Sequence, residues 1–412
     1  MKAKANLKIA VIGGGAAGFF AAIHASGPGN EVTIFEKSPK ILSKVKVSGG
    51  GRCNVTHQPL EISKLVKNYP RGEKFLKKAF RHFAIPDTFE WFQSRGVQLK
   101  IEADGRVFPV TDSSQTIIDA LTTEAQKMGV TIRLSTGIKE VNPVGEKFEL
   151  VTEQGAFRAD RVIVAAGGFP KKEGYEFLRT LKHKIASPIP SLFTFNTPKE
   201  PIRELMGLAV SDGLVKLEGT KLNYRGPVLI THWGISGPAV LKLSAFGADW
   251  LHGENYQAKA LINWNANFGE NDYVENLSAY AKSHPNRKIQ SHALVDIPSR
   301  LWGHCCERAG IDSNALFGNI SKKSMNRLIQ HLFCYNLEVS GKTTFKEEFV
   351  TAGGIDLNEV NPDTMQSVYY PNLYFAGEIL NLDGITGGFN FQAAWTTGFI
   401  AGQTCKSIIY DQ

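Results

Sequence analysis

The sequence predicts an α/β protein in which one domain, built from both ends of the chain, is interrupted by an inserted domain. The length of 412 residues exceeds what a single compact core usually holds. Short buried strands followed by glycine clusters occur near both ends of the chain but not in its middle. The composition, 42% apolar and 21% charged, is typical of a globular protein.

The first elements form a strand, a helix and a second strand within about 30 residues. Leu7–Ile12 is a short apolar run, a glycine-rich turn follows at Gly13–Gly18, and a helical pattern continues to about Ser26. The next strand is expected at Glu31–Phe35. Further helices are expected near 73–83, 86–95 and 116–128, and further strands at 131–134, near 148–152 and at 161–165.

The texture changes at a proline-rich stretch that begins at Pro188. Strand-like runs fill about 190–263, residues 270–340 favour helices, and strands with glycines return at Thr351. An inserted domain explains why the two ends resemble each other. The predicted division is 1–189 with 346–412 as one domain, 190–265 as a β-rich insert, and 266–345 as its helical subdomain.

The first glycine turn has the GxGxxG spacing of a dinucleotide site. It contains Gly13, Gly15, Ala16, Ala17 and Gly18. The first glycine makes the tight turn, the second lets backbone approach a pyrophosphate, and the third lets helix and strand pack closely. The helix start offers N–H groups to the phosphates. Glu36 ends the second strand, where an acid would accept hydrogen bonds from ribose hydroxyls and disfavour a 2′-phosphate.

Separate glycine-rich segments favour FAD over NAD, because FAD is extended and needs a second cradle. Ser48–Asn54 could hold the pyrophosphate and flavin end, with Arg52 and the loop amides as donors. Tyr374–Glu378 is an apolar strand that runs into a glycine and an acid. Thr386–Gln392 opens a helix whose amides could face the flavin N1–C2=O edge. No His or Cys pattern indicates covalent flavin attachment, so the FAD is expected to be non-covalent.

No residue stands out as the proton donor of a flavin reaction. Cys53 is a weak candidate, because a cysteine in such a loop is more often a packing residue. His232 is also a weak candidate, because a lone histidine is usually structural. A second GxGxxG with a basic partner is absent from the sequence, so NAD(P)H would reach the flavin only transiently. The five cysteines show no metal-site spacing, so no metal is expected.

The net charge of +8 is concentrated in one segment. Residues 64–81 carry seven Lys and Arg against Glu73, with apolar residues at helical spacing between them. This pattern is typical of a solvated helix face, or alternatively of a polyanion contact such as RNA. No stretch approaches the roughly 20 apolar residues of a membrane span, and the odd cysteine count fits a reducing cytoplasm. The oligomeric state is not indicated.

Several motifs together resemble a bacterial family of FAD-dependent oxidoreductases. They are SGGGRCNVT (48–56), GRVFP (105–109), THWGISGPAVLKLS (231–244), VTAGGI (350–355) and the block 364–402. The family includes aminoacetone oxidases, bile-acid 4,6-reductases and a 23S ribosomal RNA dihydrouridine synthase. The resemblance spans nearly the whole chain. It implies a Rossmann-type FAD-binding domain interrupted by a β-rich insert that carries a small helical subdomain.

The resemblance also implies a set of FAD-contacting positions. They are Gly13, Gly15, Gly18, Glu36, Lys37, Gly50, Arg52, Asn54, Gly377, Glu378, Gly388, Phe389, Asn390, Phe391 and Gln392. The glycine-rich loops add Ala16, Ala17, Cys53, Gly167 and Gly387 to the predicted cofactor-binding set.

Three functions stay open on the sequence. The first is a flavin reductase of an activated C=C bond, with uridine in ribosomal RNA as one candidate acceptor and NAD(P)H as reductant. The basic segment favours it modestly, since phosphate contacts supply most non-specific RNA affinity. The second is an oxidase of a small amine or amino ketone. The third is a non-catalytic FAD- or RNA-binding module, in which the loop at 386–392 would have no evident purpose.

Overall fold

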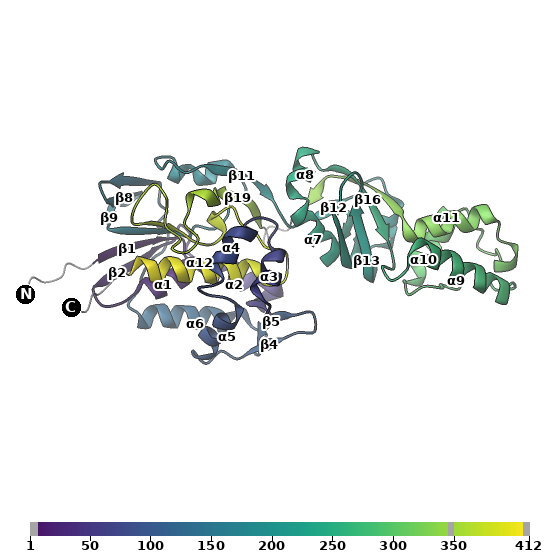
Figure 1. Cartoon of the computed structure of the whole chain (residues 1–412), viewed down its shortest axis with the longest axis horizontal. Coiled ribbons are helices and arrows are strands. Elements are labelled where there is room, and N and C mark those ends of the chain that lie inside the picture. The colour runs from purple at the N-terminus through teal and green to yellow at the C-terminus, as the bar shows by residue number, and fades with distance from the viewer. Residues whose placement is uncertain (1–6, 345–349, 407–412) are drawn as a thin grey trace, which may run out of the picture. The chain divides into compact units, whose positions relative to one another are not determined.

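The computed structural model of the chain describes residues 7–344 and 350–406. The chain divides into two compact units (Figure 1). One consists of Met1–Ser191 and Lys346–Gln412, and the other of Leu192–Phe345. The second unit is therefore an insertion in the sequence of the first.

A five-stranded parallel sheet forms the centre of the first unit, in the order β20–β10–β1–β2–β6. Its strands are β1 (Leu7–Ile12), β2 (Asn30–Phe35), β6 (Thr131–Arg133), β10 (Arg161–Val164) and β20 (Leu373–Phe375). Every pairing is parallel, so the carboxyl ends of all five strands lie at one edge. The inner strands are apolar on both faces, as a covered parallel sheet requires. This is the predicted Rossmann-type arrangement.

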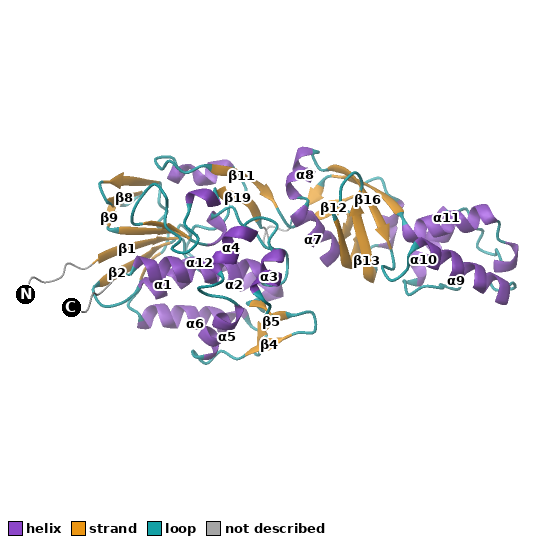
Figure 2. Cartoon of the chain, viewed as in Figure 1, coloured by secondary structure: helices purple, strands orange, loops and turns teal. Residues whose placement is uncertain are grey.

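Two of the helices in this unit pack closely against each other (Figure 2). They are α1 (Ala16–Ala25) and α12 (Phe389–Cys405). At the contact, α12 presents Gly398 and Gly402 to the backbone of α1. A Cβ on Gly402 would lie 2.5 Å from the carbonyl oxygen of Ala21, and one on Gly398 would lie 2.7 Å from that of Ala17. The close approach therefore depends on the missing side chains.

Shorter elements complete the first unit. The antiparallel strands are β3 (Thr56–His57), β4 (Leu99–Ile101), β5 (Arg106–Pro109), β7 (Glu140–Val144), β8 (Lys147–Thr152), β9 (Gly155–Ala159), β11 (Ile185–Pro190) and β19 (Thr351–Ile355). They form the sheets β3–β5–β4 and β7–β8–β9 and the pair β11–β19. The remaining helices are α2 (Ser43–Val47), α3 (Ile62–Leu65), α4 (Glu73–Ala79), α5 (Ile85–Gln93) and α6 (Ser114–Lys127).

The second unit contains a seven-stranded antiparallel sheet, in the order β17–β16–β13–β14–β15–β12–β18. The strands are β12 (Thr194–Asn196), β13 (Ala209–Leu217), β14 (Asn223–Thr231), β15 (Gly234–Ser236), β16 (Gln257–Asn263), β17 (Tyr335–Ser340) and β18 (Lys342–Thr343). The helices are α7 (Pro238–Phe246), α8 (Ala248–Gly253), α9 (Glu270–Ser283), α10 (Ser299–Arg308) and α11 (Lys322–Phe333). One hydrophobic core joins the sheet to helices α9, α10 and α11, with Trp264 and Trp302 fully buried.

Two segments of this unit differ from the sequence-based expectation. The sequence predicts a helical region that includes 335–340, but these residues form β17, in which buried and exposed residues alternate. Within the expected strand-like run of 190–263, residues 238–253 instead form α7 and α8. Pro238 begins α7 immediately after Gly237, whose φ of +93° turns the chain, and the buried positions then follow helical spacing. Both segments are short compared with the stretches around them, so the hydrophobic periodicity of the longer stretch dominates the prediction.

Among the helices that the structure describes, none has the length and apolar character needed to cross a lipid bilayer.

Replacing Gly402 by Ala is expected to destabilise the first unit by about 1–3 kcal/mol, because the new methyl group overlaps the α1 backbone. Chemical denaturation of the purified proteins measures this change. The control is Gly27→Ala in the same unit, where a Cβ would have no described atom within 4 Å. Its effect should stay within about 0.5 kcal/mol. Equal stability of the two variants would contradict the packing argument.

Candidate functional site

The carboxyl edge of the parallel sheet has a switch point at β1, which lies between β2 and β10. Ligands of open α/β sheets bind at such a point. Gly13 directly follows β1 and has a φ of +112°, and a Cβ there would overlap the carbonyl oxygen of Ala165, which directly follows β10. A Cβ on Gly18 would likewise overlap the carbonyl oxygen of Gly13. These two glycines serve the close packing of the chain itself.

Four other glycines in the predicted cofactor-binding loops border open space. A Cβ on Gly15, Gly50, Gly51 or Gly167 would have no described atom within 4 Å. Gly15 is the most informative, because its φ of −92° is accessible to any residue. Neither backbone strain nor packing within the described chain requires a glycine there, whereas a pyrophosphate approaching the backbone would. Gly15 also begins α1, whose first turn has no capping side chain among the described residues.

Glu36 stabilises the first glycine turn. Its carboxylate accepts hydrogen bonds from the backbone N–H of Gly14 at 2.7 Å and of Ser38 at 2.8 Å. A carboxylate has further lone pairs, so it can accept ribose hydroxyls at the same time. The neighbouring Lys37 is exposed, with its Nζ 4.9 Å from the ring centroid of Phe169.

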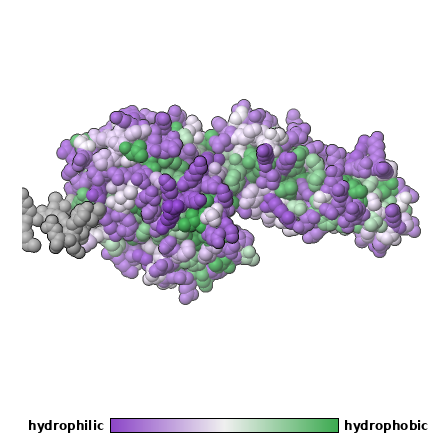
Figure 3. Space-filling model, viewed as in Figure 1, coloured by the Kyte–Doolittle hydropathy of each residue, from purple (hydrophilic) through white to green (hydrophobic). Residues whose placement is uncertain are grey.

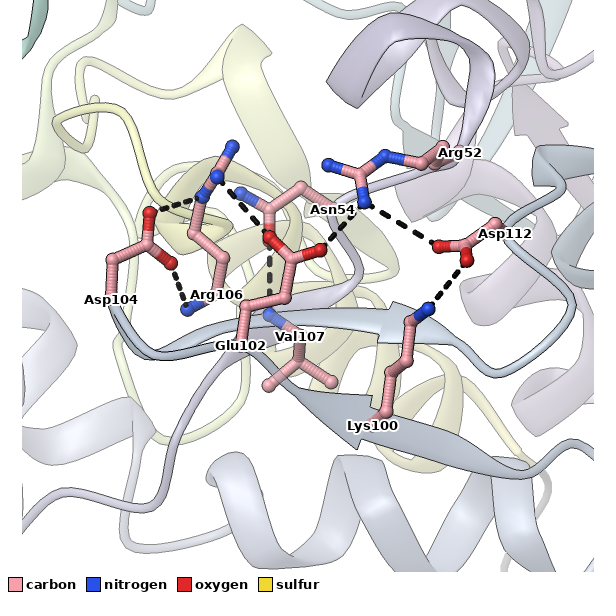
Figure 4. Close-up of polar contacts among 8 residues, drawn as sticks. All are labelled: Arg52, Asn54, Lys100, Glu102, Asp104, Arg106, Val107 and Asp112. Atoms are coloured by element: carbon pink, nitrogen blue, oxygen red, sulfur yellow. Dashed lines mark hydrogen bonds and ion pairs between the residues drawn. The ribbon is translucent and has the colours of Figure 1, made fainter.

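The second glycine loop is held by a hairpin formed by β4 and β5. Gly49, Gly50 and Gly51 have φ values of 59°, 69° and 85°, a run that favours glycine. The side chain of Arg52 then leaves the loop toward this hairpin (Figure 4). Its Nη1 lies 2.6 Å from Glu102 Oε1, and its guanidinium carbon lies 3.9 Å from the Phe108 ring centroid.

The next two residues, Cys53 and Asn54, contact other parts of the chain. Cys53 is fully buried, and burial raises the pKa of its thiol to about 12, so the thiol is neutral near pH 7. The Asn54 amide oxygen can approach Val107 N at 3.4 Å (Figure 4). In the opposite orientation, which satisfies both ends of the amide, it donates to the Thr56 carbonyl and accepts from Gly388 N, both at 3.0 Å. Asn54 thereby joins the second glycine loop to the C-terminal one.

The end of β20 meets the first turn of α1. Gly377 has a φ of +76°, and a Cβ there would lie 2.7 Å from the Cβ of Ala17. Its N–H donates to Thr397 Oγ1 at 2.8 Å. The following Glu378 accepts from Thr351 N at 2.9 Å and forms an ion pair with Lys44 at 2.6 Å. The glycines that follow β1, β10 and β20, namely Gly13, Gly167 and Gly377, therefore lie at the same edge of the sheet.

The start of α12 is fixed by its own side chains. Gly388 has a φ of +89°, and a Cβ there would overlap the Thr56 carbonyl. Asn390 donates to and accepts from the backbone of Gly384, both at 2.8 Å. The buried Gln392 accepts from Thr56 Oγ1 at 2.6 Å and Thr88 Oγ1 at 2.9 Å. These two side chains hold the loop, so their polar atoms are engaged within the chain.

Aromatic rings flank the same helix start. The ring of Phe389 stacks on His57 with centroids 4.8 Å apart, and Phe391 stacks on Trp395 at 5.7 Å. Gly387 has a φ of +129° and lies against Phe389. The remaining candidate from the sequence is His232. His232 is exposed in the second unit, where its carbonyl accepts from Arg203 Nε at 2.8 Å.

Sequence reasoning missed a buried ion pair before the C-terminal glycines. Asp383 is fully buried and is bonded by Arg71 Nε at 2.5 Å and by the Ser191 hydroxyl. Burial raises the pKa of Asp383, and Arg71 opposes that effect. The prediction that all basic residues of 64–81 are exposed is wrong for Arg71, because only 14% of its side chain is exposed. A single acid within the glycine-rich block 381–388 was the available clue.

Known proteins resemble the chain over nearly its full length. The family model described as HI0933-like protein Rossmann domain matches residues 7–404. The chain is 28% identical to a 3-dehydro-bile acid delta(4,6)-reductase of Clostridium scindens, covering 96% of this chain and 98% of the relative. It is 29% identical to the ribosomal RNA dihydrouridine synthase of Escherichia coli, covering 95% and 96%.

Solved structures show the same fold. The chain matches a 3-ketosteroid-delta4-(5alpha)-dehydrogenase from Rhodococcus jostii with a TM-score of 0.51 and 14% identity over 98% of both chains. A 3-ketosteroid delta1-dehydrogenase from Sterolibacterium denitrificans gives a TM-score of 0.50 with 12% identity, over 96% of this chain and 98% of that one. The chain therefore belongs to the HI0933-like Rossmann family, and it is an FAD-dependent oxidoreductase.

Proposed function

We propose that the chain holds FAD non-covalently along the carboxyl edge of its parallel sheet and reduces a C=C bond conjugated to a carbonyl group. NAD(P)H is the proposed transient reductant. The observation that carries the FAD site is the open space at Gly15, Gly50 and Gly167, which the packing of the described chain does not use. Bound FAD supplies the hydride chemistry.

Each glycine-rich segment is proposed to contact a different part of FAD. The N-terminus of α1, with Gly15, Ala16 and Ala17, binds the pyrophosphate through backbone N–H groups. Glu36 accepts the ribose hydroxyls. The remaining FAD contacts are proposed for Gly13, Gly18, Lys37, Gly50, Arg52, Cys53, Asn54, Gly167, Gly377, Glu378, Gly387, Gly388, Phe389, Asn390, Phe391 and Gln392. Of these, Cys53, Asn390 and Gln392 would contribute backbone atoms only, because their side chains are buried or hydrogen-bonded within the chain. The N-terminus of α12 places its partial positive charge toward the flavin N1–C2=O edge.

The choice of a reductase rests on the names of two relatives. A bile acid delta(4,6)-reductase and a dihydrouridine synthase both saturate a C=C bond that is conjugated to a carbonyl, and each aligns with nearly the full chain. Neither name describes amine oxidation. A second GxGxxG is absent from the sequence, so the nicotinamide is proposed to visit the flavin without a domain of its own.

A uridine base in ribosomal RNA is one candidate substrate. Lys74, Lys77 and Lys78 are exposed on α4, and Arg81 is exposed just beyond it. Figure 3 shows a strongly hydrophilic surface over this helix. Lys67 forms an ion pair with Glu73 at 2.5 Å, so the four residues on and after α4 are the stronger candidates for phosphate contacts.

Gly15→Val is expected to give a folded but colourless protein. A Cβ at this position has no described atom within 4 Å and the backbone conformation is accessible to any residue, yet the side chain enters the space proposed for the pyrophosphate. Flavin absorbance measures FAD content, and circular dichroism measures folding. Gly27→Val, which also adds a side chain in open space, should stay yellow. A fully yellow Gly15→Val variant would count against the site.

Anaerobic addition of NADH or NADPH is expected to bleach the flavin absorbance of the holoenzyme. Reoxidation by a conjugated enone or by uridine-containing RNA would then identify the acceptor class. The proposal fails if nicotinamides leave the spectrum unchanged while a small amine bleaches it and peroxide appears on admission of oxygen.

Replacing Lys74, Lys77, Lys78 and Arg81 together by Glu is expected to weaken RNA retention and reduce its salt dependence, because each phosphate contact releases counterions. Filter binding over a salt series measures both quantities. In the control variant the exposed Lys282, Lys322, Lys323 and Arg327 are replaced by Glu, so the net charge changes by the same amount. Equal losses in both variants would indicate a net-charge effect without an RNA site on α4.

A further inference from the structure

A cluster of charges on the β4–β5 hairpin holds two arginines side by side. The Glu102 carboxylate bridges them, with Oε1 2.6 Å from Arg52 Nη1 and Oε2 3.2 Å from Arg106 Nη2 (Figure 4). Both guanidinium groups also lie over the ring of Phe108, at 3.9 Å and 5.3 Å from its centroid. Asp104 Oδ2 lies 2.7 Å from Arg106 Nε, and Asp112 Oδ1 lies 3.4 Å from Arg52 Nη1. Like charges repel, so these two carboxylates, Glu102 and the ring together hold the arginines in place.

Each arginine keeps donors that the described residues do not use. Arg52 Nε and Nη2, and Arg106 Nη1, have no hydrogen-bond partner within residues 7–344 and 350–406. The side chains are 32% and 38% exposed, so a ligand can reach them. In the view of Figure 4 both guanidinium groups lie on the same side of Glu102, with the Asn54 side chain between them.

The cluster borders the turn at the start of α12. Arg52 directly follows the open glycines Gly50 and Gly51. Asn54 bonds the N–H of Gly388. Across the β3–β5 pairing, Arg106 is opposite His57, whose ring stacks on Phe389. The hairpin is therefore tied to the segment that we proposed for the flavin edge.

We propose that Arg52 and Arg106 form an oxyanion site for the carbonyl oxygen of the substrate, with Glu102 as their positioning residue. This assigns the Arg52 guanidinium to the substrate in place of FAD. This inference rests on the proposed function. When hydride adds to the β-carbon of a conjugated carbonyl compound, the C=C electron pair moves toward the carbonyl oxygen and an enolate forms. A proton from water then forms the C–H bond at the α-carbon. Charged donors fixed in advance near that oxygen stabilise the enolate.

The substrate class that fits is a planar enone or a uracil-type imide. Such a compound presents an sp2 oxygen in the plane of its C=C bond, and a guanidinium edge donates to such an oxygen directionally. An anionic oxygen of a FAD phosphate would use the same donors, so the substrate carbonyl and the FAD phosphate are the two candidate ligands to be distinguished.

The test uses p-fluorophenol, whose phenolate mimics an enolate, bound to the full-length holoenzyme with FAD in place. Fluorine NMR over a pH series gives the pKa of the bound phenol. Wild type should lower this pKa by about 1 unit or more, as a cation within bonding distance does. Arg52→Gln and Arg106→Gln should each remove most of the shift, and Arg52→Lys should retain part of it.

The matched control is Arg95→Gln. Arg95 forms a comparable ion pair with Glu124 at 2.8 Å, and its guanidinium carbon lies 4.0 Å from the Trp91 ring centroid. Its partners lie on α6 and α5 and not on the β4–β5 hairpin. It should leave the phenol pKa shift unchanged. The proposal is overturned if wild type fails to bind p-fluorophenol or to lower its pKa, or if both glutamine variants keep the full shift.

The FAD dissociation constant separates the two sources of anionic oxygen. Arg106→Gln should change it by less than about twofold if the site serves the substrate. A rise of about tenfold would assign the cluster to the cofactor phosphates and overturn the proposal. Phenol ionisation requires no electron transfer, so it remains informative if nicotinamide fails to reduce the flavin. That separate failure would instead argue against the proposed reductase.

Discussion

The candidate site depends on the close approach of strand ends that have no side chains to separate them. Gly13 touches the end of β10, Gly18 touches Gly13, and Gly377 touches the first turn of α1. Larger residues at these points would push β1, β10 and β20 apart, because their Cβ atoms would overlap backbone or a neighbouring Cβ atom. Gly15, Gly50 and Gly167 form a second class, because a Cβ on any of them would meet no described atom within 4 Å. The space beside them can hold a ligand only if the close packing at Gly13, Gly18 and Gly377 keeps the strand ends together.

Buried hydrogen bonds then fix the C-terminal glycine turn to the N-terminal half of the chain. Gln392 bonds Thr56 and Thr88, and Trp395 Nε1 donates to the Val55 carbonyl at 2.9 Å. Leaving one such buried group without its partner costs about 1–3 kcal/mol. The helix start that faces the proposed flavin is therefore positioned by residues that are more than 300 positions away in sequence.

Local patterns predicted the parts of this arrangement that local chemistry determines. The GxGxxG turn between β1 and α1 follows from a spacing within one βαβ unit, and its strand and helix were predicted from periodicity. The pairing of Arg71 with Asp383 was not predictable, because it joins residues far apart in sequence. The same holds for Asn390 and Gln392, whose side chains make internal hydrogen bonds that no motif reveals. β17 was missed because six alternating residues were averaged with the helices before them.

The Arg71–Asp383 pair is better explained by geometry than by stability. Removing both charges from water has a large desolvation cost, and apolar replacements of buried ion pairs are often neutral or stabilising. The bidentate geometry, however, fixes orientation as an apolar contact does not. It links the segment before α4, Ser191 at the end of the first stretch of the unit, and the turn before α12. A chain that leaves this unit at Ser191 and re-enters it at Lys346 needs such a directional link, because the loop that carries Asp383 begins only after the insertion.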